Sequence, residues 1–152
     1  MKFILSTVLV FLCTVSLSAK AVLPPIEFER IVVEIADTDY ELEYAKTLSQ
    51  RARGLMFRQR MCSDCGMLFN FDVPRIGSIW MKNTQIPLDL AYVDDNGIIT
   101  DIFPLTPHDL TPVRSSKPIS YAIEMNQGWF AKQGVKVGDR IKVKRKNISD
   151  RN

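Results

Sequence analysis

The sequence contains little cysteine, histidine or glycine, and these shortages exclude several classes of protein. Among its 152 residues there are 3 Cys, 1 His, 7 Gly and 8 Pro. A collagen-like or low-complexity chain needs much more Gly and Pro, and a disulfide-dense miniprotein needs more Cys. The hydrophobic fraction of 46%, the charged fraction of 24% and the net charge of +3 are instead those of one ordinary globular domain.

A long hydrophobic run is also absent, apart from a short one near the N-terminus. Lys2 precedes an apolar segment over residues 3–15, and Ala19 and Ala21 form a small-residue cleavage site. A membrane-spanning helix needs about 20 apolar residues, which this run does not supply. We therefore predict a signal peptide over residues 1–21, export to the periplasm or medium, and no stable membrane span after cleavage. Retention of the segment as an uncleaved anchor stays open.

Charge of one sign is scarce as well. Removal of Lys2 and Lys20 lowers Lys plus Arg from 20 to 18 against 17 acidic residues, so the mature charge is about +1. Such a chain lacks the broad positive field that attracts nucleic acids, and we predict no nucleic-acid partner. The basic residues at 140–146 alternate with Ile141 and Val143, which is typical of a strand with a solvated basic face.

Most of the remaining pattern has the period of two that is typical of strands. Turn residues separate the segments, and Asn96-Gly97 is a strong hairpin signal. A capping-box pattern, Thr47 with Gln50, predicts a short helix over residues 48–53, and one helical turn is expected over 128–133. Residues 106–118 contain three prolines and predict a loop. Strands are predicted over 29–35, 40–45, 66–71, 77–81, 88–93, 98–105, 121–126 and the basic C-terminal segment.

About eight strands and two short helices indicate an α+β, mainly β fold. Residues 22–152 are expected to form a single compact domain. Its strands should be mostly antiparallel, because we see no connection with the dozen or more helical residues of a parallel crossover. A sheet of this size avoids open edges by curling, so we expect a partly closed barrel.

Several motifs occur in an order that resembles the domain-of-unknown-function family 192. They are Arg53-Gly54-Leu55-Met56, Gly66-Met67-Leu68-Phe69, Ile79-Trp80-Met81-Lys82-Asn83-Thr84, Ile86-Pro87-Leu88-Asp89, Glu124 and Gly138-Asp139. The resemblance covers about residues 31–144. It implies a compact β-rich domain, often exported in bacteria, without an established activity. The sequence departs from the family at residues 62–65, where relatives tend to carry polar residues, so a role of the thiols is not implied.

Cys62 and Cys65 form a CxxC motif with three possible uses. In an oxidising compartment they are expected to pair, although so short a loop yields only about 2 kcal/mol of stabilisation. A thiol-disulfide helper would place the first Cys at a helix N-terminus, whereas this motif follows a predicted helix and leads into a strand. A zinc site needs four ligands, and the chain has one CxxC and one His. We favour a structural disulfide and predict no metal site.

A polar run follows Trp80 and is the main candidate binding site. Lys82, Asn83 and Thr84 share one turn, and Asp89 begins the next strand. Such side chains can hold a polar ligand, or they can cap their own backbone while Lys82 pairs with Asp89 or Glu124. Arg53 either joins this cluster as a carboxylate partner or lies on the helix surface.

Recognisable catalytic motifs are missing. The single histidine, His108, lies in the predicted loop, and no nucleophile elbow, phosphate loop or dinucleotide fingerprint is present, so we predict no cofactor. Asp89, Glu124 and Asp101 could supply a carboxylate pair for hydrolysis. Whether the protein is an enzyme therefore stays open.

Three functional hypotheses remain. The favoured one is a noncatalytic binding or accessory module for a small polar or saccharide-like ligand or a partner segment, through Arg53, Lys82, Asn83, Thr84, Asp89 and Glu124. The second is a hydrolase that uses Asp89 or Glu124. The third is a thiol-disulfide helper that uses Cys62 and Cys65.

Overall fold

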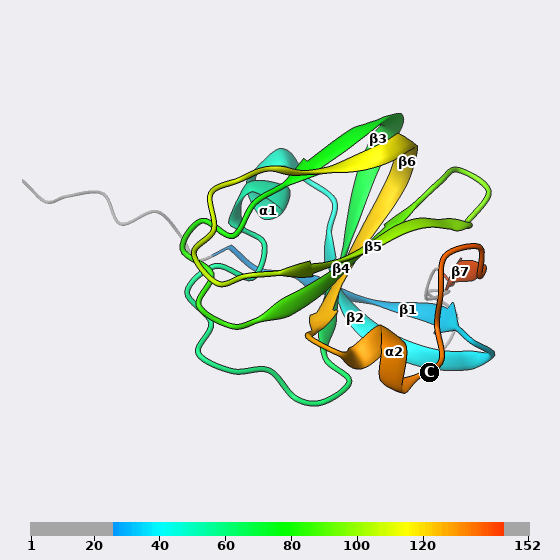
Figure 1. Cartoon of the computed structure of the whole chain (residues 1–152), viewed down its shortest axis with the longest axis horizontal. Coiled ribbons are helices and arrows are strands. Elements are labelled where there is room, and N and C mark those ends of the chain that lie inside the picture. The colour runs from blue at the N-terminus through cyan, green and yellow to red at the C-terminus, as the bar shows by residue number, and fades with distance from the viewer. Residues whose placement is uncertain (1–25, 145–152) are drawn as a thin grey trace, which may run out of the picture.

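One seven-stranded sheet organises residues 26–144, the part of the chain described by the computed structural model (Figure 1). The predicted signal peptide and the end of the basic segment lie outside the described residues. The strand order across the sheet is β5-β4-β6-β3-β2-β1-β7. The elements are β1 (Glu29–Ile35), β2 (Thr38–Ala45), α1 (Leu48–Arg53), β3 (Gly66–Ile79), β4 (Leu88–Val93), β5 (Ile99–Leu105), β6 (Val113–Asn126), α2 (Trp129–Lys132) and β7 (Ile141–Lys144).

The sheet curls until its two edge strands meet at one end. Ile98, just before β5, forms an isolated antiparallel bridge with Arg140, just before β7. The Ile99 amide donates to the Asp139 carbonyl over 2.9 Å, and the Ile141 amide donates to the Gly97 carbonyl over 2.8 Å. The prediction of a mainly β domain with a partly closed barrel is therefore confirmed.

The central strands carry a hydrophobic core on each face. Leu68 and Ile123 are paired across β3 and β6 and belong to the core that α2 and β1 help to cover. Met67 and Leu90 point to the other face, where a second core includes Phe69 and Leu88. This alternation follows from the period of two along each strand. Because of this alternation, each polar residue of β4 and β6 lies on one face of the sheet or on the other.

The first helix is set by local chemistry. The Thr47 hydroxyl accepts from the Gln50 amide, and the Gln50 side chain accepts from the Thr47 amide, so the predicted capping box is confirmed. Gly54 ends α1 with a φ of 46°, and a Cβ there would come within 3.3 Å of the Phe69 ring. Glycine therefore lets the end of α1 approach the second core. Among residues 26–144, neither helix has the length and apolarity needed to cross a bilayer.

Two expectations about the strands need correction. The structure has seven strands rather than about eight among the described residues, because the segments predicted at 66–71 and 77–81 are one strand, β3. Its pairing with β6 is interrupted between Asn70 and Arg75 and between Ile76 and Ser78. Because of these interruptions, the sequence pattern does not indicate one continuous strand. The loop predicted at 106–118 is shorter, since β6 already begins at Val113.

One strand pair also differs in direction from the rest. β2 and β3 are parallel, with Tyr44 opposite Leu68. Residues 46–65 supply the crossover, and only α1 within them is an α-helix. A short helix with irregular flanking segments is therefore sufficient for a parallel connection, and no long crossover helix is needed between β2 and β3.

Candidate functional site

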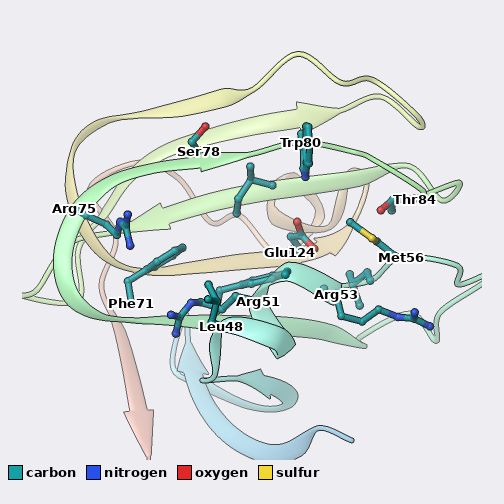
Figure 2. Close-up of a pocket in the computed structure, with 15 residues that line it drawn as sticks. Leu48, Arg51, Arg53, Met56, Phe71, Arg75, Ser78, Trp80, Thr84 and Glu124 are labelled. Atoms are coloured by element: carbon teal, nitrogen blue, oxygen red, sulfur yellow. The ribbon is translucent and has the colours of Figure 1, made fainter. Parts of the chain in front are cut away.

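A pocket of about 250 Å³ lies between α1 and the curled strand β3, on the face of the second core (Figure 2). Strand β6 forms its floor, and the segment after α1 closes one side. The pocket exists because β3 bends at its two irregular positions. One limb of β3 therefore contributes Phe69 and Phe71, and the returning limb contributes Arg75, Ser78 and Ile79.

The floor of the pocket carries an acidic side chain, Glu124. Its residue is only 5% exposed, and its neighbours across the strands, Met67 and Leu90, are fully buried. No hydrogen bond or ion pair joins its carboxyl to another of the residues 26–144. Burial raises the pKa of Glu124 to about 8, so the carboxyl is mainly protonated at neutral pH. A neutral carboxyl can both donate and accept a hydrogen bond.

The walls around Glu124 are mainly apolar. The aromatic rings of Phe69 and Phe71 come from one limb of β3. The Trp80 ring lies across the pocket from Phe71 (Figure 2). Leu55 and Met56 come from the segment that follows α1. Such walls can pack against the apolar part of a ligand, and Glu124 is the acidic group with which a polar group of that ligand could form a hydrogen bond.

Three arginines lie around the pocket, and they differ in their contacts. Arg51 donates to the backbone carbonyls of Lys46 and Asn70 at 2.7 and 2.8 Å and pairs with Asp72 at 3.6 Å. Arg53 is exposed, stacks over the Phe57 ring at 4.6 Å and points away from the pocket (Figure 2). Arg75 is exposed and has no ion-pair partner among the described residues. Arg75 is therefore the arginine that can receive an anion at the rim.

The structure brings together only part of the predicted site. Arg53, Thr84 and Glu124 line the pocket, whereas Lys82 and Asn83 do not. Lys82 is exposed, with its Nζ 5.3 Å from the centre of the Trp80 ring. The turn keeps Lys82 and Asn83 outside the pocket, because Asn83 has a φ of 54° and its carbonyl accepts from the Phe57 amide. Thr84 is buried, and its hydroxyl donates to the Lys82 carbonyl, as the backbone-capping alternative requires.

Asp89 lies on the opposite face of the sheet from Glu124. In the regular pairing of β4 with β6, Leu90 is opposite Glu124 and Asp89 is opposite Met125. Asp89 accepts from the Gly128 amide over 2.8 Å, and burial raises its pKa. Asp101 accepts from the Thr100 hydroxyl and does not line the pocket. The geometry thus does not support a catalytic pair built from these carboxyls.

The CxxC motif forms a disulfide outside the pocket. Cys62 and Cys65 are bonded, and the loop between them is tied to the end of β6. The Asn126 amide donates to the Cys62 carbonyl over 2.7 Å, and the Trp129 indole donates to the Asp64 carboxylate over 3.0 Å. Within residues 26–144, no three His, Cys, Asp or Glu side chains gather in a way that could hold a metal ion.

The sequence reading missed the residues on the returning limb of β3. Arg75 and Ser78 follow Pro74 in a segment without regular alternation, so they were not assigned to the same strand as Phe71. His108, which the sequence singled out, is exposed in a turn, where its amide donates to the Thr84 carbonyl. If one long, bent strand had been recognised in place of two short ones, Arg75 and Ser78 would have been placed with Phe71 around the same pocket.

Comparisons with known proteins place the chain in a family without assigning an activity. Structurally, it is similar to a chain from Sinorhizobium meliloti 1021 described as "a putative transcription regulator", with 35% identity, a TM-score of 0.75, and coverage of 79% of this chain and 98% of that one. It is also similar to a protein of unknown function from Novosphingobium aromaticivorans DSM 12444, with 29% identity, a TM-score of 0.69, and coverage of 86% and 99%. No curated protein matches. The model of the DUF192 family, described as "Uncharacterized ACR", matches residues 30–143, and the chain belongs to this family.

Proposed function

We propose that this protein is a noncatalytic binding module and that the pocket above Glu124 is its small-molecule site. The observation that carries the proposal is the Glu124 carboxyl, which belongs to a residue only 5% exposed, lines the pocket and has no hydrogen-bond partner among residues 26–144. Within residues 26–144 no side-chain nitrogen or oxygen is both fully buried and unpaired, so the Glu124 oxygens are open to the pocket. A ligand group can therefore reach the carboxyl, and a hydrogen bond formed in these apolar surroundings is stronger than one in bulk water.

The surroundings of Glu124 support a small ligand rather than a large one. Ligand sites are concave and mostly apolar and contain a few polar groups that fix orientation. Here the apolar walls come from α1, β3 and the segment after α1, and the polar groups are Glu124, Thr84 and the rim arginines. The proposal keeps the binding function expected from the sequence and moves the site from Lys82, Asn83 and Asp89 into the pocket.

A fragment library tests the proposal directly. The purified protein is titrated with neutral, anionic and cationic fragments while its backbone amides are followed by two-dimensional NMR. We expect hits that shift the amides of Gly54, Ser78 and Thr84. Ser78→Phe fills the pocket and should abolish these shifts, whereas Thr38→Phe, at an exposed position of β2, should retain them. Hits that all map elsewhere, or no hits, would contradict the proposal.

One observation favours a second candidate, a hydrolase with Glu124 as its acid. A carboxyl with a raised pKa inside a pocket is the environment of many general acids. Against this, Asp89 points to the opposite face and cannot serve as the second carboxylate. We expect no turnover of 4-nitrophenyl esters or glycosides. Turnover that disappears in Glu124→Gln and persists in Asp89→Asn would replace the binding proposal with a hydrolase.

The relative described as a regulator raises nucleic-acid binding as another use, and we propose that this chain lacks it. Both basic side chains of β7 form ion pairs, since Lys142 pairs with Glu34 and Lys144 pairs with Glu34 and Asp39. Nucleic-acid affinity depends on cations that can replace counterions at phosphates. Fluorescence anisotropy with labelled duplex DNA at 150 mM salt should detect no binding, and salt-dependent binding would contradict this expectation.

A further inference from the structure

We propose that the pocket binds an amphipathic monoanion, with the acidic group of the ligand on Arg75, its apolar chain along β3, and a neutral hydroxyl on Glu124. This inference rests on the proposed binding function and names the class of ligand. Three features of the described residues carry it: the charge of the rim, the neutrality of the floor, and the position of the two groups along the sheet.

The rim is positive, which favours an anion. Arg51, Arg53 and Arg75 line the pocket, and among residues 26–144 only Arg51 of the three has an acidic partner, the exposed Asp72. Arg53 points away over Phe57, so it contributes to the field more than to direct contact (Figure 2). Arg75 lies on the returning limb of β3, at the other end of the pocket from Arg53 (Figure 2). Its guanidinium offers a planar set of donors that suits a carboxylate.

The floor selects a neutral hydrogen-bonding group. Glu124 lies in an apolar environment, and no cation among the described residues contacts it. A ligand amine could take its proton and form an ion pair, but that amine would have to pass between the arginines of the rim. A hydroxyl meets no such barrier, and it can accept from and donate to the protonated carboxyl.

The positions of Arg75 and Glu124 set the length of the ligand. Arg75 pairs with Ile119 of β6, so five steps along that strand separate the backbone position of Arg75 from Glu124. At about 3.3 Å per residue, this distance is roughly 16 Å, and both side chains shorten the remaining gap. Phe71 and Ile79 line the same pocket and give it apolar walls. A medium-length alkyl chain with polar groups at both ends fits this arrangement.

Four probes of the same chain length test the assignment by isothermal titration calorimetry. 8-Hydroxyoctanoate carries both groups, octanoate lacks the hydroxyl, 1,8-octanediol lacks the anion, and 8-amino-1-octanol replaces the anion by a cation. We expect 8-hydroxyoctanoate to bind most tightly. Octanoate and octanediol should each bind about fivefold to tenfold more weakly, as the loss of one hydrogen bond or one charged contact implies, and the amino-alcohol should bind most weakly.

Variants connect each probe to its residue. Arg75→Gln should weaken 8-hydroxyoctanoate to the level of octanediol and leave octanediol unchanged. Arg60→Gln removes an exposed arginine outside the pocket and should change neither probe. Glu124→Leu should remove the advantage of 8-hydroxyoctanoate over octanoate.

The outcomes separate this inference from the proposed function. If the diol or the amino-alcohol binds as tightly as 8-hydroxyoctanoate, the assignment of an anion is wrong, and so it is if Arg75→Gln has no effect. In either case, binding that Ser78→Phe abolishes keeps the pocket as a small-molecule site. If none of the four probes binds at 10 mM while library fragments still shift the pocket amides, the inference fails and the proposed function stands. If neither the probes nor the library binds in the pocket, both fail.

Discussion

At the scale of single residues, the properties of Glu124 follow from its neighbours. Met67 and Leu90 flank it across β3 and β4, and both are fully buried. The sequence contained this information only in part, since Glu124 stands among the apolar residues of β6. The sequence indicates Glu124 as a candidate and groups it with the polar residues that follow Trp80 and with Asp89. Pairing across strands, which a single sequence does not reveal, places Glu124 at the floor of an apolar pocket.

The raised pKa of Glu124 predicts a stability that falls as pH rises. Below about pH 4.5 the carboxyl is protonated in both the folded and the unfolded chain, so it has no effect. Between this pH and about 8 the unfolded chain releases the proton while the folded chain keeps it. The free energy of unfolding should therefore decrease, by up to about 1.4 kcal/mol per pH unit, and level off above pH 8.

Glu124→Gln isolates this effect. The neutral amide has a similar shape, so the variant should become increasingly more stable than the wild type between pH 5 and pH 8. Urea unfolding of both proteins at several pH values gives the difference directly. Asp89→Asn is the control for a buried carboxyl on the other face, because it leaves Glu124 in place and should therefore keep the fall in stability that Glu124 causes up to about pH 8. Parallel curves for the wild type and Glu124→Gln would show that Glu124 titrates normally.

A second prediction at this scale concerns Gly66, where β3 approaches β6 closely. A Cβ at Gly66 would collide with the Met125 sulfur and with the Glu124 carbonyl. Gly66→Ala should lower the free energy of unfolding by about 3 kcal/mol, in the upper part of the range for overpacking. Gly128→Ala is the control, because a Cβ there meets nothing within 4 Å and only the φ of 83° is unfavourable. An equal loss in both variants, measured by urea unfolding, would contradict the collision.

At the scale of elements, local sequence signals predicted α1 and the hairpin between β4 and β5 correctly. They did not predict the bend in β3. The capping box of Thr47 and Gln50 gave α1 its correct bounds, and Asn96-Gly97 gave the hairpin between β4 and β5. Both depend on contacts within a few residues. β3 was divided in two, because its curl is stabilised by distant residues, such as the Ser115 hydroxyl that accepts from the Gly77 amide. That curl forms two walls of the pocket.

The disulfide loop is the element whose role can be measured most simply. The Cys62–Cys65 bond closes a short loop, so the double variant Cys62→Ser with Cys65→Ser should lose only about 2 kcal/mol of stability. Ligand affinity at the pocket should not change, because neither cysteine lines it. A reduction potential below about −300 mV would mark the bond as structural, whereas a clearly more oxidising one would favour the thiol-disulfide helper.

At the scale of the whole molecule, the candidate site exists because the two faces of the sheet pack against different elements. One face closes the barrel with α2, β1 and β7, and the other supports α1 and the pocket. Glu124 and Asp89 are separated by this division although they lie on adjacent strands. The fold class could be predicted from alternation and composition. The site could not, because it depends on which distant segments share a face.

The most direct test of the account is a two-dimensional NMR titration of the purified protein with 8-hydroxyoctanoate, followed at the backbone amides. We predict saturable shifts at Gly54, Ser78 and Thr84 that disappear in Ser78→Phe, while the amides near Asp89 and Gly128 on the other face stay unchanged. Shifts confined to residues 82–89 or to the disulfide loop, or no saturable shift at all, would contradict the account.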